Sequence, residues 1–157
     1  MRKIDLFFAE YCKNHRNKTN KLIHWMCVPL TFWSILGFIS LLPSPHICSP
    51  YFGCASIISM VAVAFITVFY LRLSFLISMM MLIIMILMEG SIYMVNIRFL
   101  KNAWIIYFSI FLVTWILRLF GHRIEGKKPP FLKDLQFLLM GPIWLLTFIF
   151  KKTGIKY

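Results

Sequence analysis

Long apolar runs without a charged side chain constrain the fold of this chain more than any other feature. Residues 22–42 and 51–71 each contain 21 positions without Lys, Arg, Asp or Glu. A helix needs about 20 apolar residues to cross the hydrocarbon core of a bilayer. Since 61% of the 157 residues are hydrophobic and only five are acidic, the sequence predicts an integral membrane protein rather than a soluble domain.

Two further apolar runs follow the first pair. Residues 73–97 are interrupted by Glu89 and Gly90, and residues 103–120 contain Arg118, whose side chain is expected to reach the interface. Runs two and three are predicted to form a tight helical hairpin around Arg72. The sequence thus predicts four transmembrane helices.

The two ends of the chain differ from these runs. Residues before the first span mix apolar and charged side chains, which predicts an N-terminal amphipathic helix. The last apolar segment, 135–150, is short and contains Gly141-Pro142, which favours an interfacial or re-entrant helix. The predicted fold is all-α: a multi-pass helical bundle in which residues 1–157 form a single integral membrane domain.

The distribution of basic residues predicts the orientation. The net charge is +12, but Lys and Arg gather at the ends of apolar runs, where they meet anionic lipid head groups, so nucleic-acid binding is not expected. Six precede the first span, five lie between 118 and 133, and none lies in the Pro-rich turn 43–50. The positive-inside rule therefore places the N-terminus and residues 118–133 on the cytoplasmic side. Cys48 and Cys54 flank the opposite turn closely enough for a disulfide.

Three of the four histidines fall in the cytoplasmic margins, and each has a polar residue at helical spacing. The pairs are Tyr11 and His15, Asn20 and His24, and His122 and Glu125. The fourth histidine, His46, lies in the turn on the opposite side. The shared face of the three histidines predicts a metal site there.

A straight helix cannot bring His15 and His24 together, because nine residues turn through about 900 degrees and point the rings in opposite directions. The segment 17–20 is poor helix sequence and good capping sequence. A helix break is therefore predicted there, with Thr19 or Asn20 as the cap of the first span.

Each of these residues has a simpler interpretation. A histidine near a membrane interface is often only hydrogen-bonded. Glu125 can pair with Arg123 on the surface, where ion pairs contribute little. Glu89 can be a functional carboxylate within an apolar run, or it can cap a helix end.

Two blocks of the sequence together resemble the family of membrane 2-hydroxy fatty acid dioxygenases, typified by the fungal protein of phytosphingosine metabolism. The first block is Tyr11-x3-His15-Arg16-Asn17-x2-Asn20-x3-His24-x4-Pro29. The second is Gly121-His122-x2-Glu125-x3-Pro129-Pro130, followed by Gly141-Pro142. The resemblance covers nearly the whole chain. It implies an Fe(2+)-dependent enzyme of fatty acid α-oxidation, which converts a 2-hydroxy fatty acid and O2 to the fatty acid one carbon shorter with loss of CO2.

By this resemblance, His15, His24 and His122 are the expected iron ligands, and Glu125 is the next candidate ligand or a base. Imidazole and carboxylate groups suit iron(II). Tyr11 and Asn20 would orient the ligands. The basic margin, with Arg16, Arg123 and Lys127, would bind the substrate carboxylate, while the apolar bundle accepts the acyl chain.

Two other classes of function fit a small apolar chain. One is a non-enzymatic membrane scaffold or lipid-binding protein, and the other is a transporter. Transport is less favoured, because the polar residues gather on one face rather than near the bilayer midplane. The charge distribution predicts a site facing the cytoplasm. The resemblance implies a multi-pass protein with a link to sphingolipid metabolism, in the endoplasmic reticulum membrane of a eukaryote, and a bacterial chain would lie in the inner membrane. The oligomeric state is left open.

Overall fold

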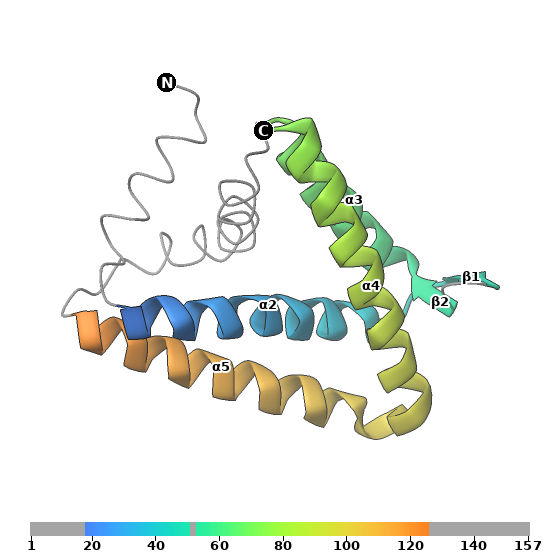
Figure 1. The fold of residues 1–157 in the computed structure, drawn as a ribbon. Helices are drawn as coiled ribbons and strands as arrows, with labels where there is room; N and C mark the ends of the chain where they lie inside the picture. Colours follow the sequence, from blue (N-terminus) through green and yellow to red (C-terminus); the bar gives the residue numbers. More distant parts are fainter. Residues whose placement is uncertain (1–17, 51–52, 126–157) are drawn as a thin grey trace. The chain divides into compact units, whose positions relative to one another are not determined.

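The computed structural model describes residues 18–50 and 53–125, and these are mostly helical (Figure 1). The elements, in chain order, are α2 (Lys18–Ser40), β1 (His46–Ser49), β2 (Gly53–Ser56), α3 (Ile57–Leu71), α4 (Phe75–Phe99), the short 3-10 helix η1 (Leu100–Asn102) and α5 (Ala103–Glu125). The predicted N-terminal amphipathic helix and the segment 135–150 lie outside the described residues.

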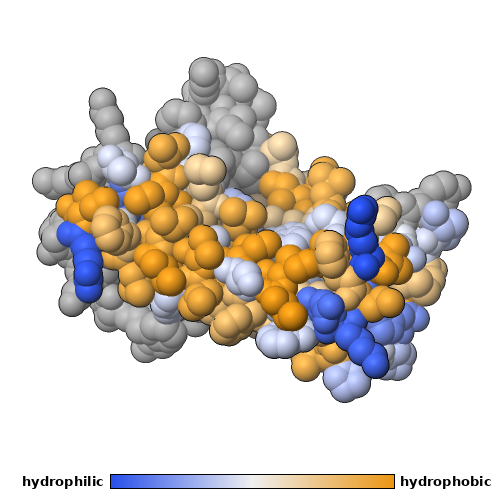
Figure 2. Space-filling view, turned by 90° about the horizontal axis from the view of Figure 1, so that it is seen from below, coloured by the Kyte–Doolittle hydropathy of each residue, from blue (hydrophilic) through white to orange (hydrophobic). Residues whose placement is uncertain are grey.

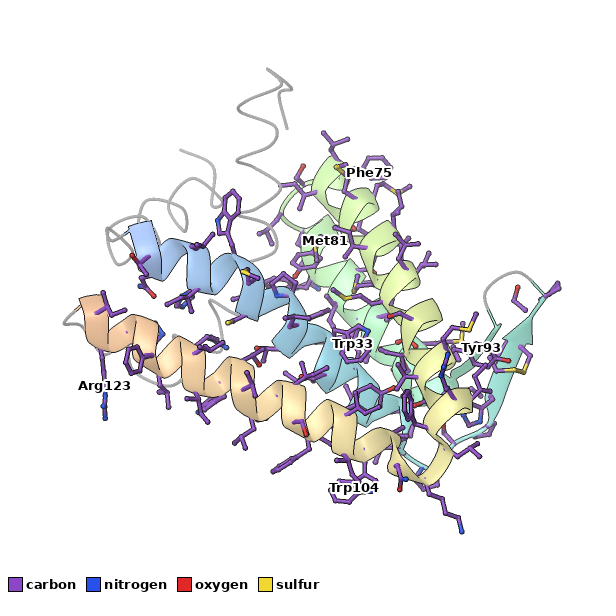
Figure 3. The ribbon with its side chains drawn as sticks, turned by 60° about the horizontal axis from the view of Figure 1, so that its bottom comes forward. Trp33, Phe75, Met81, Tyr93, Trp104 and Arg123 are labelled. Carbon is purple, nitrogen blue, oxygen red and sulfur yellow. A yellow bond between two sulfur atoms is a disulfide. The ribbon has the colours of Figure 1, made fainter. Side chains whose placement is uncertain are left out.

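A small β-hairpin occupies the region where the sequence predicts a turn and the start of the second span, so the all-α prediction is wrong at this point. Strands β1 and β2 pair antiparallel, with Cys48 opposite Cys54, and these two cysteines form a disulfide. Gly53 has a φ of +77°, and a Cβ there would overlap the ring of Tyr93. Glycine is suited to such a position because it has no side chain to clash. Figure 3 shows Tyr93 beside the hairpin.

Helix α3 begins at Ile57 because the side chain of Ser56 accepts a hydrogen bond from the backbone N–H of Ser59 and caps the helix. The hairpin leaves α3 with 15 residues, about 22 Å, which is shorter than the hydrocarbon core. The predicted span 51–71 is therefore not supported as a full-length helix.

Two stretches are long and apolar enough to cross a membrane. They are Leu22–Ser40, and Phe75–Ile124, which contains α4, η1 and most of α5. The prediction of four separate spans is therefore not supported, because α3 is short and the third and fourth runs form one apolar stretch of 50 residues.

Helices α3 and α4 pack against each other, as predicted, with the connection at Arg72. The hydroxyl of Ser78 donates to the backbone carbonyl of Thr67 at 3.1 Å. The Ser59 hydroxyl donates to the carboxylate of Glu89. Glu89 therefore lies within the helix and contacts α3, rather than capping a helix end.

The described part of the chain divides into two compact units, one of residues 18–31 with 112–125 and the other within Phe32–Phe111. In the second unit, a Cβ at Gly37 would overlap the ring of Tyr107, so glycine permits a close approach of α2 and α5. The Tyr107 hydroxyl donates to Oδ1 of Asn96 at 2.8 Å, and Nδ2 of Asn96 donates to the Ser40 hydroxyl at 3.1 Å. These bonds tie α2, α4 and α5 together within this unit.

Many large apolar side chains remain exposed, and the face in Figure 2 is predominantly hydrophobic over the described helices. Phe65 is 77% exposed and Phe75 is 70% exposed. Large exposed apolar surfaces mark membrane or protein contacts. The surface therefore agrees with the two membrane-length stretches.

Candidate functional site

The first unit contains an antiparallel contact between the start of α2 and the end of α5. Contacts at two levels fix the register: the rings of His24 and His122 lie 4.9 Å apart, and the hydroxyl of Thr31 donates to that of Thr114 at 3.0 Å. The buried polar side chains described in this unit all belong to this contact, which we call the polar seam: Asn20, His24, Thr31, Thr114, Arg118 and His122.

The polar seam follows from helical periodicity in both helices. On α2, the members of the seam recur every three or four residues if the small residue Cys27, which lies between His24 and Thr31, is counted with them. On α5 the spacing is four residues throughout, from Thr114 to His122. Residues at these intervals share one side of a helix, so two such stripes meet when the helices pack antiparallel.

His24 and His122 form the centre of the site. They are 3% and 8% exposed, and their rings meet edge to face with an interplanar angle of 74°. Nδ1 of His24 lies 3.1 Å from the backbone carbonyl oxygen of Asn20. Because a carbonyl oxygen can only accept, Nδ1 must donate, and the neutral ring then carries its lone pair on Nε2.

Asn20 and Gly121 show how closely the helices approach at this level. Asn20 is fully buried, and a Cβ at Gly121 would overlap its side-chain oxygen. Helix α2 begins at Lys18, so Asn20 lies inside the first turn and the predicted cap at Thr19 or Asn20 is wrong. Its backbone carbonyl, rather than its side chain, bonds to His24.

Arg118 is buried in the same seam, with 2% of its surface exposed. The sequence predicts that this side chain reaches the interface, and the structure shows it buried instead. Its guanidinium carbon lies 5.8 Å from the centre of the Trp115 ring.

The remaining predicted site residues are not joined to this pair by the structure. His15, Tyr11, Arg16 and Lys127 lie outside the described residues. Glu125 is the last residue of α5, and its side chain is not described. Arg123 is exposed and points away from the helix pair (Figure 3).

Two imidazoles are therefore the metal-binding groups that the described chain brings together. Within residues 18–50 and 53–125, no three His, Cys, Asp or Glu side chains form a group that could hold a metal ion. The third predicted ligand, His15, belongs to the part that is not described. His46 is exposed on β1, apart from this pair in sequence and in secondary structure.

Sequence reasoning did not identify three features of the seam: Gly121, the Thr31–Thr114 bond and the burial of Arg118. The spacing of four residues from Thr114 through Arg118 to His122 was a usable signal. It places one threonine, one cation and one histidine on the same side of α5. This pattern does not show which other helix packs against that side of α5.

A second polar feature lies in the other unit. The carboxylate of Glu89 borders a cavity of about 590 Å3 between the hairpin, α3 and α4. The cavity walls are mostly apolar: Ile47, Met60, Val63, Ala64, Val68, Leu82 and Ile86. Among the groups that line it, Glu89 is the only charged one.

Comparison with known protein families shows to which family this chain belongs. The profile of the Mpo1-like family, described as 2-hydroxy-palmitic acid dioxygenase Mpo1-like, matches residues 1–153. The chain belongs to the Mpo1-like family. The match covers both blocks that carry the resemblance found in the sequence, so that prediction is confirmed. Comparisons of this Mpo1-like chain with curated proteins and with solved structures gave no match.

Proposed function

We propose that this Mpo1-like protein is an iron(II)-dependent dioxygenase of fatty acid α-oxidation. Its substrates are a 2-hydroxy fatty acid and O2, and its products are the fatty acid one carbon shorter, CO2 and water. The bond between the carboxyl carbon and C2 breaks, C2 is oxidised to the new carboxyl group, and O2 is the oxidant. The family description, which names a dioxygenase and a 2-hydroxy fatty acid, supports this reaction class.

The observation that carries the proposal is the buried pair of His24 and His122. A ligating histidine usually donates its other ring N–H to a carbonyl or carboxylate, which fixes the ring and its tautomer. His24 makes this bond to the Asn20 carbonyl. The donor set therefore fits a metal of the first transition series.

His15 and Glu125 are the groups proposed to complete the ligand set. Three histidines, or two histidines with the carboxylate, would suit iron(II) and leave open positions. Bound iron(II) would supply the electron transfer that lets O2 react with the organic acid. Tyr11 and Asn20 would hold the ligands in place, and the burial of the histidine pair excludes bulk water.

The surroundings of the pair suit an amphiphilic substrate. The apolar surfaces of α2 and α5 would hold the acyl chain, while cations near the cytoplasmic end would attract the carboxylate. Arg16, Arg123 and Lys127 are candidates for this attraction. The exposed position of Arg123 suits the capture of an approaching acid.

We also propose a multi-pass topology with the histidines facing the cytoplasm. Six basic residues precede position 22 in the sequence, on the N-terminal side of α2, and the hairpin with the Cys48–Cys54 disulfide follows its C-terminal end. Basic segments remain cytoplasmic, whereas disulfides persist in oxidising compartments. Charge and redox chemistry therefore support the same orientation.

The test uses the full-length protein in lipid nanodiscs. Iron content is measured first, and 2-hydroxy-palmitic acid is then supplied with O2 while pentadecanoic acid is quantified by mass spectrometry. We expect one iron per chain and stoichiometric O2 uptake. His24→Ala and His122→Ala should each lose bound iron and reduce turnover by more than about 100-fold. Removal of a ligand should have a larger effect than removal of a group that only hydrogen-bonds to a ligand.

His46→Ala is the matched control, because it removes an exposed histidine from the hairpin and should leave iron content and turnover unchanged. If the wild-type protein binds no iron and forms no shortened acid, the dioxygenase proposal fails and a lipid-binding scaffold becomes the better account. If turnover persists in both histidine variants, the ligand assignment fails.

A further inference from the structure

The cavity beside Glu89 has the size and lining of a pocket for a small molecule. Its volume is about 590 Å3, and ligand pockets usually enclose about 300–1,000 Å3 and combine apolar walls with a few polar groups. Helices α3 and α4 and the β-hairpin supply the lining residues. All of these residues belong to the unit within Phe32–Phe111, so the cavity lies inside one compact unit.

The hairpin forms one wall of the cavity with alternate residues of its two strands. Those residues are Ile47, Ser49, Gly53 and Ala55. Successive residues of a strand point to opposite faces, and Cys48 and Cys54 occupy intervening positions, where they form the disulfide. The disulfide therefore joins the strands from the face that does not line the cavity.

Glu89 is held at the edge of the cavity by a hydrogen bond from α3. The donor is the hydroxyl of Ser59, a fully buried residue whose backbone N–H donates to the side chain of Ser56 at 3.1 Å. In the described part of the chain, Ser59 is the one hydrogen-bond partner of this carboxyl group. A carboxylate can accept about four hydrogen bonds, so Glu89 retains acceptor capacity for a ligand.

The charge of the cavity selects the class of ligand. Glu89 is the only acidic residue between Glu10 and Glu125 in the sequence. Among the described residues that line the cavity, none is Lys or Arg. An ionised carboxyl group without a cation is costly in apolar surroundings and is typical of functional positions. A cationic ligand would supply the missing charge, whereas an anionic ligand would be repelled.

We propose that this cavity binds a single-chain aliphatic amine taken up from the surrounding lipid. The ammonium group donates to the carboxylate of Glu89, and the alkyl chain lies against the apolar walls of α3 and α4. Hydrogen bonds between two charged groups are stronger than those between neutral groups. The ligand is opposite in charge to the acid proposed as substrate, so this binding site is separate from the proposed reaction.

The test compares two ligands of equal chain length, dodecylamine and 1-dodecanol. Binding to the full-length protein in lipid nanodiscs is measured calorimetrically, and the heat of binding to empty nanodiscs is subtracted. Wild type should bind the amine about 10 to 100-fold more tightly than the alcohol, the range expected of a charge-assisted hydrogen bond. Glu89→Gln keeps an acceptor for Ser59 but removes the charge, so it should abolish this preference while leaving the affinity for the alcohol unchanged.

A second variant tests the cavity independently of the charge. Ala64 lines the cavity, and Ala64→Leu should lower the affinity for both ligands by about tenfold or more, because the added side chain occupies their space. Ala62→Leu is the matched control: it makes the same substitution on α3 at a residue that does not line the cavity, and it should keep both affinities at the wild-type values. Circular dichroism and the unfolding temperature check that each variant is folded.

Three results would overturn the proposal. Wild type binds amine and alcohol equally, Glu89→Gln keeps the preference for the amine, or folded Ala64→Leu binds both ligands as tightly as wild type does. The last result would place the amine outside the cavity. Each of these results leaves the proposed dioxygenase reaction untouched, because iron content and formation of the shortened acid are measured separately and do not involve Glu89.

Discussion

The polar seam of α2 and α5 and the hairpin region of β1, β2, α3 and α4 each contain a charged side chain in an apolar helix, but Arg118 is buried whereas Glu89 is half-buried. In the polar seam, Arg118 shares its helix face with His122, whose ring meets that of His24. In the hairpin region, Glu89 accepts a hydrogen bond from Ser59 and borders a mostly apolar cavity. A charged side chain in an apolar helix is common to both regions, but the pair of histidine rings belongs to the seam.

This difference separates the proposed catalytic site from a region that the proposed reaction does not use. The seam joins the two imidazoles that are proposed to bind a metal, and none of its described contacts is covalent. The hairpin region is held by the Cys48–Cys54 disulfide, by Gly53 and by the ring of Tyr93. Changes in the hairpin region should therefore lower stability without changing turnover per folded molecule, whereas changes in the seam should lower turnover and have a smaller effect on stability.

The largest stability effect is expected at Gly53. Gly53→Ala places a side chain at a φ of +77° and against the ring of Tyr93. The two costs together should lower the free energy of unfolding by about 2–4 kcal/mol. Chemical denaturation followed by circular dichroism measures this loss.

Gly90→Ala is the matched control, because no atom lies within 4 Å of a Cβ placed there, in the interior of α4. Alanine is the better helix former by up to about 1 kcal/mol, so this variant should be as stable as wild type or more stable. Equal stability of the two glycine variants would contradict the packing of Tyr93 on the hairpin.

The next effect is expected at the disulfide. Replacing Cys48 and Cys54 together by Ser removes a cross-link that closes a short loop, which should cost about 2 kcal/mol of stability. Turnover per folded molecule should match wild type. Reducing agent should shift the unfolding transition of wild type to that of the double variant and leave the transition of the double variant unchanged. If both transitions shift, the effect of the reducing agent does not come from the Cys48–Cys54 disulfide.

Among these three sites, Gly121 is expected to have the smallest effect on stability and the largest effect on function. The added Cβ of Gly121→Ala requires the side chain of Asn20 to move. Because the atom in the way is the end of a side chain that can adjust, the substitution should cost about 1 kcal/mol of stability. Movement of Asn20 disturbs the residue whose carbonyl orients His24. Turnover should fall by about tenfold or more, in line with the loss of support for a metal ligand. Iron content and product formation are measured together; unchanged values would remove Asn20 from the site.

Local sequence patterns predicted most of the helices but not the hairpin. The apolar runs predicted α2, α4 and α5 to within a few residues, because helix length and hydropathy are local properties. The strands at His46–Ser49 and Gly53–Ser56 were missed. Each has four residues, and their pairing depends on a turn and a disulfide that bring them together.

The candidate site residues also show which features local sequence predicts and which depend on tertiary contacts. Helical spacing selected His24 and His122 as residues with polar neighbours, and charge placed them on one face. The meeting of their rings across two helices depends on an antiparallel register that neither segment encodes alone. Arg118 shows the limit most directly, because the same position near a helix end permits a side chain that reaches the interface or one that turns inward.

The sequence by itself determined the membrane-length apolar segments, the basic margins beside them and the membership in the Mpo1-like family, since each depends on composition or on residues close together in the chain. Tertiary structure decided that His24 meets His122, that Arg118 is buried in the same seam and that Glu89 faces a cavity. Periodicity fixes which side of a helix a residue occupies. Packing contacts such as that of Asn20 against Gly121 fix which other helix that side meets.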